Sequence, residues 1–147
     1  MHGLPGGGAE MLVDSVRMDI SPKKGSADNW IRVMREAQEI GLTTSATNVI
    51  GFGESRADRI LHMDRIRSAQ DNAISSGNIG FTSFISWPVQ LENNVFGARN
   101  RGNNRIRLGA SSTEYLRHVA VSRIFFDNII HIQASWPTMG LEIAQLA

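Results

Sequence analysis

The chain contains no cysteine among its 147 residues. It can therefore form no disulfide and no thiolate zinc site of its own, and it supplies no ligand for an iron–sulfur cluster. Its histidines, His2, His62, His118 and His131, show no spacing typical of metal ligands. An apolar run of about 18 residues, which a membrane span requires, is also missing, as is a signal-peptide pattern. We therefore expect a cytoplasmic protein with no membrane partner.

An excess of one charge is missing too, since 15 Lys and Arg against 14 Asp and Glu leave a net charge of +1. The clearest basic segment carries Arg99, Arg101, Arg105 and Arg107, which could meet a phosphate or a carboxylate. Glycine and asparagine separate these arginines, whereas nucleic-acid platforms interleave aromatic side chains. A solvated loop is the favoured interpretation, and we expect no nucleic-acid partner.

Helix-like and strand-like segments alternate along the chain. Apolar residues at helical spacing predict helices at 10–20, 26–41, 55–73 and 111–128. Residues rich in β-branched and aromatic side chains predict strands at 43–51, 79–87 and 130–136, with a further strand at 1–5 left open. Residues 91–111 read as a polar loop. This alternation indicates an α/β fold of parallel βαβ units.

The predicted strands are too few to close a β/α barrel, and parallel strands need cover on both faces. We therefore expect residues 1–147 to form a single, incomplete domain, the middle and later part of a barrel. Capping boxes are expected at Ser55 and Ser111. The helix at 55–73 should bury Ile60, Leu61, Met63 and Ile66, while His62 and His118 should lie mid-helix as surface or packing residues.

The first candidate site is the glycine run in "LPGGGAE". It matches neither the P-loop nor the dinucleotide fingerprint, because no Lys follows it and position 11 is Met. Bare backbone at Gly7 and Gly8 would let a ligand reach N–H groups at a helix N-terminus. Glu10 would then lie in the first helical turn. The alternative is a tight strand-to-helix turn in which Glu10 only complements the helix dipole.

Three more candidate segments follow predicted strands, at the end that carries the active site in β/α barrels. In "GFGES", Glu54 could bind a ligand hydroxyl or amine, or could simply start a helix. In "SWPVQLENN", Trp87 offers a stacking face and the amides offer hydrogen bonds, although an ordinary polar loop remains open. In "QASW", the choice lies between ligand contact and buried strand packing. The polar residues concerned are Gln90, Asn93, Asn94, Gln133 and Ser135.

Taken together, these segments resemble one family. "LPGGGAE", "TTSATNVIGFGE", "GFTSFISWPVQLENN" and "NIIHIQASWPTMG" are similar, in this order, to successive strand ends of the radical S-adenosylmethionine enzymes of menaquinone and deazaflavin-cofactor biosynthesis. The resemblance covers essentially the whole chain. Within the family, Trp87, Gln90 and Asn93, with "QASW", look most like cyclic dehypoxanthinyl futalosine synthase.

The resemblance implies an incomplete TIM-like radical S-adenosylmethionine barrel. Its cofactors would be S-adenosylmethionine and a four-iron four-sulfur cluster, whose three cysteines would lie in the loop of the barrel's first strand, before this chain. The implied cofactor-binding residues are Gly7, Gly8, Glu10, Gly51 and Glu54, with the strand at 79–87 offering backbone to the adenine. The implied substrate-binding residues are Trp87, Gln90, Asn93, Gln133 and Ser135.

The implied reaction belongs to the futalosine pathway of menaquinone biosynthesis. Reductive cleavage of S-adenosylmethionine yields an adenosyl radical, which takes a ribose hydrogen from dehypoxanthine futalosine. The sugar radical closes on the aromatic ring, and loss of an electron and a proton gives the spirocyclic product. The partners implied are this small nucleoside substrate and a reductant protein such as flavodoxin.

The chain departs from the family pattern at two positions. The family typically has His where this chain has Phe52, and Met where it has Asn48. Two alternatives stay open beside the cyclase. One is a relative of aminofutalosine synthase or of the deazaflavin-cofactor synthase. The other is a non-catalytic α/β module that binds a nucleotide-like ligand or a partner through its open sheet edges.

Overall fold

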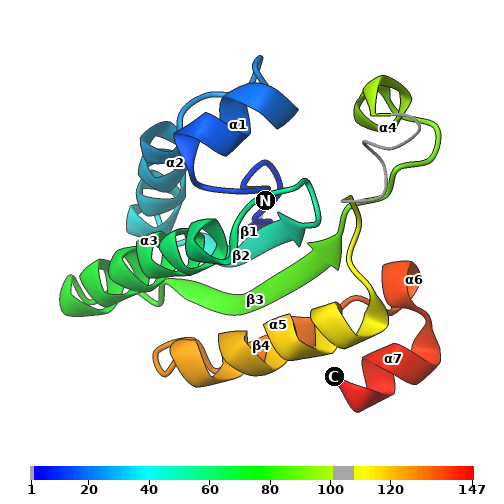
Figure 1. Ribbon diagram of the computed structural model, residues 1–147. Helices are drawn as coiled ribbons and strands as arrows, with labels where there is room; N and C mark the ends of the chain where they lie inside the picture. Colours follow the sequence, from blue (N-terminus) through cyan, green and yellow to red (C-terminus); the bar gives the residue numbers. More distant parts are fainter. Residues whose placement is uncertain (1, 101–107) are drawn as a thin grey trace.

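The computed structural model describes residues 2–100 and 108–147, so Arg101, Arg105 and Arg107 lie outside the described residues. Strands and helices alternate along most of the chain (Figure 1). The strands are β1 Gly3–Leu4, β2 Thr43–Ile50, β3 Phe81–Pro88 and β4 His131–Ala134. The helices are α1 Asp14–Ile20, α2 Ala27–Glu39, α3 Arg56–Ser75, α4 Val95–Arg99, α5 Ser112–Phe125, α6 Trp136–Met139 and α7 Leu141–Leu146.

The strands form one four-stranded sheet in the order β1-β2-β3-β4, and every pairing is parallel. Spatial order thus follows chain order, as in successive units of a β/α barrel. β2 and β3 make the longest pairing, from Thr44 opposite Phe81 to Ile50 opposite Pro88. The predicted α/β class and parallel sheet are confirmed, and the strand left open at 1–5 is present as β1.

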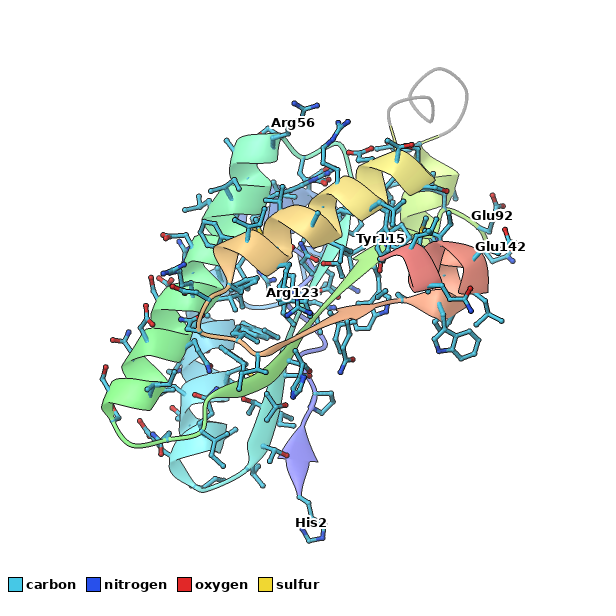
Figure 2. The ribbon with its side chains drawn as sticks, turned by 90° about the horizontal axis from the view of Figure 1, so that it is seen from below. His2, Arg56, Glu92, Tyr115, Arg123 and Glu142 are labelled. Atoms are coloured by element: carbon cyan, nitrogen blue, oxygen red, sulfur yellow. The ribbon has the colours of Figure 1, made fainter. Side chains whose placement is uncertain are left out.

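Helices α2, α3 and α5 supply the apolar core on one face of the sheet. Trp30 of α2 stacks on Phe81 with ring centroids 6.0 Å apart, and Phe84 packs on Phe126 at 4.5 Å. Met63 of α3 completes the same cluster. Figure 2 shows α3 and α5 side by side over the sheet. This burial of apolar area is the main favourable term for the fold.

The opposite face of the sheet is less covered. Along β3, Phe84, Ser86 and Pro88 are buried, whereas Ile85 and Trp87 between them stay partly exposed. Since neighbouring side chains in a strand point to opposite faces, Ile85 and Trp87 mark the second face. None of the helices in the described part of the chain is long and apolar enough to cross a membrane.

Three helices begin at the predicted serine caps, and one cap differs in detail from the prediction. Ser26, Ser55 and Ser111 each accept a hydrogen bond from the backbone three residues on. Only Ser55 has the full capping box, in which Asp58 bonds back to the cap. The box expected at Ser111 is half formed, because the carboxylate of Glu114 pairs instead with Arg59 at 2.7 Å.

Three boundaries differ from expectation. The helix predicted at 10–20 begins only at Asp14, because Glu10 has a φ of +34° that no helix tolerates. The loop predicted at 91–111 contains α4, whose first turn Asn94 caps. The strand predicted at 130–136 ends at Ala134, and Trp136 opens α6.

The buried face of α3 was also predicted wrongly in part. Ile60 and Leu61 are 42% and 44% exposed, and the fully buried residue between them and Met63 is His62. Hydropathy favours isoleucine and leucine for the core, but His62 has a specific partner there. Its Nδ1 accepts the backbone N–H of Leu12 at 2.9 Å. His118 of α5 is likewise buried and bonds Asn48 of β2 at 3.0 Å.

Both buried histidines are held neutral. Burial, aided by the neighbouring His118, lowers the pKa of His62 from 6.5 to about 3. Burial and the nearby Arg59 lower the pKa of His118 to about 4. An unfolded histidine therefore binds protons more readily than either folded one.

We predict that acid destabilises the chain through these histidines. Their contribution is fully present above about pH 6.5 and is lost as the pH falls towards the folded pKa values, each pH unit costing up to about 1.4 kcal/mol per histidine. His62→Gln should be less stable at pH 7.5, and its deficit should shrink by pH 5. The check is chemical denaturation between these pH values, with exposed His131→Gln as the matched control. An unchanged pH slope in His62→Gln would contradict this account.

Candidate functional site

The four candidate segments meet at one rim of the molecule. Each begins where a parallel strand ends, and the strands are neighbours in the sheet (Figure 1). Backbone hydrogen bonds join the segments directly. The N–H of Val49 donates to Glu10 at 2.8 Å, that of Val89 to Ile50 at 2.8 Å, and that of Gly109 to Gly51 at 2.8 Å. The first three segments, recognised separately in the sequence, thus form a continuous edge, and the fourth ends β4, which pairs with β3.

The glycines of the first segment differ in what the fold requires of them. A Cβ on Gly6 would lie 2.4 Å from the carbonyl oxygen of Ser45, so only glycine fits against β2. Gly8 has a φ of +91°, which favours glycine. Gly7 is exposed, and a Cβ there would meet no atom within 4 Å. The fold alone therefore does not require glycine at position 7.

Glu10 lies beside this run in a conformation unusual for a residue with a side chain. Its φ is +34°, and such a conformation costs about 1–3 kcal/mol unless its surroundings impose it. One carboxylate oxygen forms an ion pair with Lys24. The other, Oε2, is buried and has no hydrogen-bond partner among the described residues. Because α1 begins four residues later, Glu10 does not lie in a first helical turn as expected.

The carboxylate of Glu54, by contrast, is committed to its own loop. It accepts the backbone N–H of Gly51 at 2.9 Å and of Phe52 at 2.7 Å, and Nε of Arg59 lies 2.7 Å away. The Glu54 side chain is fully buried. Its contacts favour the helix-start alternative, in which it braces the turn before α3.

The same loop is held in place from two further directions. A Cβ on Gly51 would lie 2.6 Å from the backbone of Gly109, so the two loops touch at bare backbone. Phe52 packs edge-to-face on Phe96 of α4 with centroids 5.3 Å apart. Phe52 therefore joins the loops after β2 and β3 by an apolar contact.

The predicted residues after β3 form two groups, Trp87 with Gln90 and Asn93 with Asn94, and only the second group lines a surface hollow. Trp87 is partly exposed on the less covered face of the sheet. Gln90 is exposed, and its amide donates to the Pro88 carbonyl at 3.1 Å. Asn93 is exposed with a φ of +57°, and Asn94 caps α4. Asn93 and Asn94 line a shallow surface hollow of about 450 Å³ on the α4 loop, which does not include Trp87 or Gln90.

The two polar residues predicted at the end of β4 also differ in their surroundings. Gln133 is exposed within the strand. Ser135 is buried, and its N–H donates at 2.7 Å to the hydroxyl of Tyr115, which itself donates to the Ser86 carbonyl at 3.0 Å. Figure 2 shows Tyr115 where α5 meets the C-terminal helices. Ser135 therefore joins β3, β4 and α5, in line with the packing alternative.

The sheet register and one backbone hydrogen bond bring three of the predicted residues to neighbouring parts of this edge. Val49 bonds the backbone of Glu10 and lies opposite Trp87, and both are partly exposed. Gln133 lies opposite Ile85, which shares a face with Trp87. A glutamate, a tryptophan and a glutamine thus end or follow neighbouring strands at this edge. This combination suits a ligand with hydroxyl groups and a planar ring, such as a nucleoside.

Sequence reasoning missed some residues that shape this rim. Lys24, which pairs with Glu10, lies in the segment before α2, where no site residue was predicted. Ser45 and Thr47 of β2 bond the two sides of Gly6, at 3.0 Å and 2.6 Å. Their spacing of two residues, which puts both side chains on one face of a strand, was the available signal. The described residues contain no cluster of His, Cys, Asp or Glu that could hold a metal ion.

Comparison with known proteins agrees with this arrangement. The CofH/MqnC C-terminal region matches residues 78–147. A cyclic dehypoxanthine futalosine synthase of Halalkalibacterium halodurans is 40% identical over the whole chain, which covers 36% of that enzyme. An enzyme of the same name from Streptomyces coelicolor is 39% identical over the whole chain and 34% of its own length.

An aminodeoxyfutalosine synthase of Thermus thermophilus is 38% identical over the whole chain and 37% of the enzyme. The chain thus spans about a third of the length of the curated relatives it matches. The matched segments run through all four strand ends. Over its whole length the chain is therefore similar to enzymes of the futalosine pathway, and its residues 78–147 match the CofH/MqnC C-terminal region.

Proposed function

We propose that this chain forms part of the S-adenosylmethionine and substrate site of an enzyme that cyclises dehypoxanthine futalosine. The rim geometry carries the proposal. Oε2 of Glu10 is buried and has no hydrogen-bond partner among the described residues. Val49 bonds the backbone of Glu10 and lies opposite Trp87 in the sheet. The similarity to two cyclic dehypoxanthine futalosine synthases supports the choice of reaction.

The residues of this chain have distinct tasks in that site. Glu10 accepts a hydrogen bond from a hydroxyl or amine of the ligand, while bare backbone at Gly7 allows the ligand to approach. Trp87 stacks on a planar ring, and Gln133 offers an amide to the same face. When bound, S-adenosylmethionine supplies the radical that starts the reaction. The protein's own part is to bind, orient and exclude water.

The two cofactors of the family differ in how they fit this chain. The unpaired oxygen of Glu10 and the open space at Gly7 suit the polar groups of S-adenosylmethionine. A four-iron four-sulfur cluster is held by thiolates, and the chain has no cysteine. The residues present therefore do not fit the cluster, and its ligands must come from other residues.

A chimera tests the proposed reaction. This chain would replace the matching 147-residue segment of the Halalkalibacterium halodurans enzyme, which retains the rest of its own sequence. We expect the reconstituted chimera to convert dehypoxanthine futalosine to its cyclic product, assayed by mass spectrometry. Formation of aminodeoxyfutalosine in a parallel assay, supplied with the substrates of the Thermus thermophilus relative, would favour that enzyme's reaction. A folded, cluster-loaded chimera that produces neither would favour a non-catalytic module.

We predict that Gly7→Ala separates binding from folding. The added methyl group meets no atom of the chain, so stability should stay constant or rise by up to about 1 kcal/mol. Affinity for S-adenosylmethionine should fall about tenfold, because the methyl group occupies the approach to the backbone. Titration calorimetry and a thermal melt measure the two effects. Gly8→Ala, which is strained at its φ of +91°, is the contrasting variant and should lower stability. Unchanged affinity in Gly7→Ala would remove Gly7 from the site.

We predict that Trp87→Ala weakens nucleoside binding more than S-adenosylmethionine binding. Loss of one stacking face costs about 1–3 kcal/mol per base. Ligand-observed NMR with each ligand gives the comparison. Trp136→Ala, which removes a tryptophan that is 59% exposed on α6, is the matched control. Equal losses for both ligands, or for both variants, would argue against a stacking role for Trp87.

A further inference from the structure

Arg17 of α1 is a buried cation that the proposed site does not use. It is 4% exposed, and among the described residues its hydrogen bonds go only to backbone carbonyls. Nη1 donates to Ala9 at 2.6 Å, to Gly8 at 3.1 Å and to Met11 at 3.4 Å. Nε and Nη2 both donate to Gly25, at 3.1 Å and 2.8 Å. One guanidinium therefore joins two loops.

These bonds fix the backbone on either side of Glu10. The carbonyl of Ala9 and the N–H of Glu10 belong to one planar peptide unit, so Arg17 sets the orientation of that unit. The next carbonyl, that of Glu10, accepts from Val49. The peptide unit between Met11 and Leu12 is held at both ends. Arg17 donates to the Met11 carbonyl, and His62 accepts the Leu12 N–H. Both peptide planes flanking Glu10 are thereby determined.

The second loop held by Arg17 belongs to the same ion pair. Gly25 directly follows Lys24, whose ammonium group pairs with Glu10. Arg17 thus binds carbonyls next to both members of the pair. A residue that served only to join α1 to the core would not need contacts grouped around one carboxylate.

We propose that Arg17 is a positioning residue that holds Glu10 in its left-handed conformation and so fixes where its carboxylate lies for ligand binding. What the carboxylate binds rests on the proposed function. Without the guanidinium, Glu10 can relax to an ordinary negative φ, which side chains prefer. The carboxylate then turns away from the rim, while the core formed by α2, α3 and α5 stays assembled.

Arg17→Lys tests the proposal in the 147-residue chain. Lysine keeps the charge, but a single ammonium group lacks the fork that reaches both loops. Arg65→Lys, at a surface ion pair with Asp28, is the matched control. We expect NMR signals of β3 and α5 to stay in place in Arg17→Lys, while the scalar coupling of Glu10 shifts to that of a negative φ. Affinity for S-adenosylmethionine should fall about tenfold, as in Glu10→Gln, and the control should match the wild type.

A double-mutant cycle distinguishes this role from a merely structural one. If Arg17 acts through Glu10, Arg17→Lys has no further effect on affinity in the Glu10→Gln background. Additive losses, or an unchanged Glu10 coupling, would overturn the proposal. Arg17→Gln serves if the lysine variant does not fold, and unfolding of both would show that Arg17 acts on the fold as a whole. Should the wild-type chain bind no S-adenosylmethionine, the proposed function fails, and the Glu10 coupling still decides whether Arg17 holds that residue.

Discussion

The parallel register between β2 and β3 is the interaction on which the site depends. It runs from Thr44 opposite Phe81 to Ile50 opposite Pro88, and it brings the ends of both strands to one edge. One face of these strands carries the core residues that α2, α3 and α5 cover. The other face carries Val49 and Trp87, and the backbone of Glu10 is bonded to Val49. A slip by one residue would exchange the two faces and remove both core and site.

Two glutamates illustrate how similar sequence signals acquire different roles. Glu10 and Glu54 each follow a strand and a glycine-containing turn. Glu54 turns back onto its own loop, where two backbone N–H groups and Arg59 occupy it. Among the described residues, Glu10 accepts no backbone N–H from its own turn, and Arg17 and Val49 hold the carbonyls around it. Its carboxylate therefore faces Lys24 and retains one unpaired oxygen. The difference arises from long-range partners and not from the local motif.

The residues at positions 48 and 52 each have a partner within the chain. Asn48 is buried, and its Nδ2 bonds Nε2 of His118 on α5, whereas its Oδ1 has no hydrogen-bond partner among the described residues. A buried amide without any partner would cost more. Phe52 packs on Phe96 and makes an apolar link between two rim loops. The first contact lies in the core and the second at the rim.

The sequence by itself determined the α/β class, the parallel strands, the serine caps and the four strand-end segments, because periodicity and capping are local properties. It could not place Ile60 and Leu61 at the surface and His62 in the core, since that choice depends on the Leu12 N–H, 50 residues away. It could not separate Glu10 from Glu54, or show that Ser135 bonds Tyr115. Only the tertiary structure decided which polar groups are already satisfied, because hydrogen-bond partners distant in sequence are brought together only by the sheet register and helix packing.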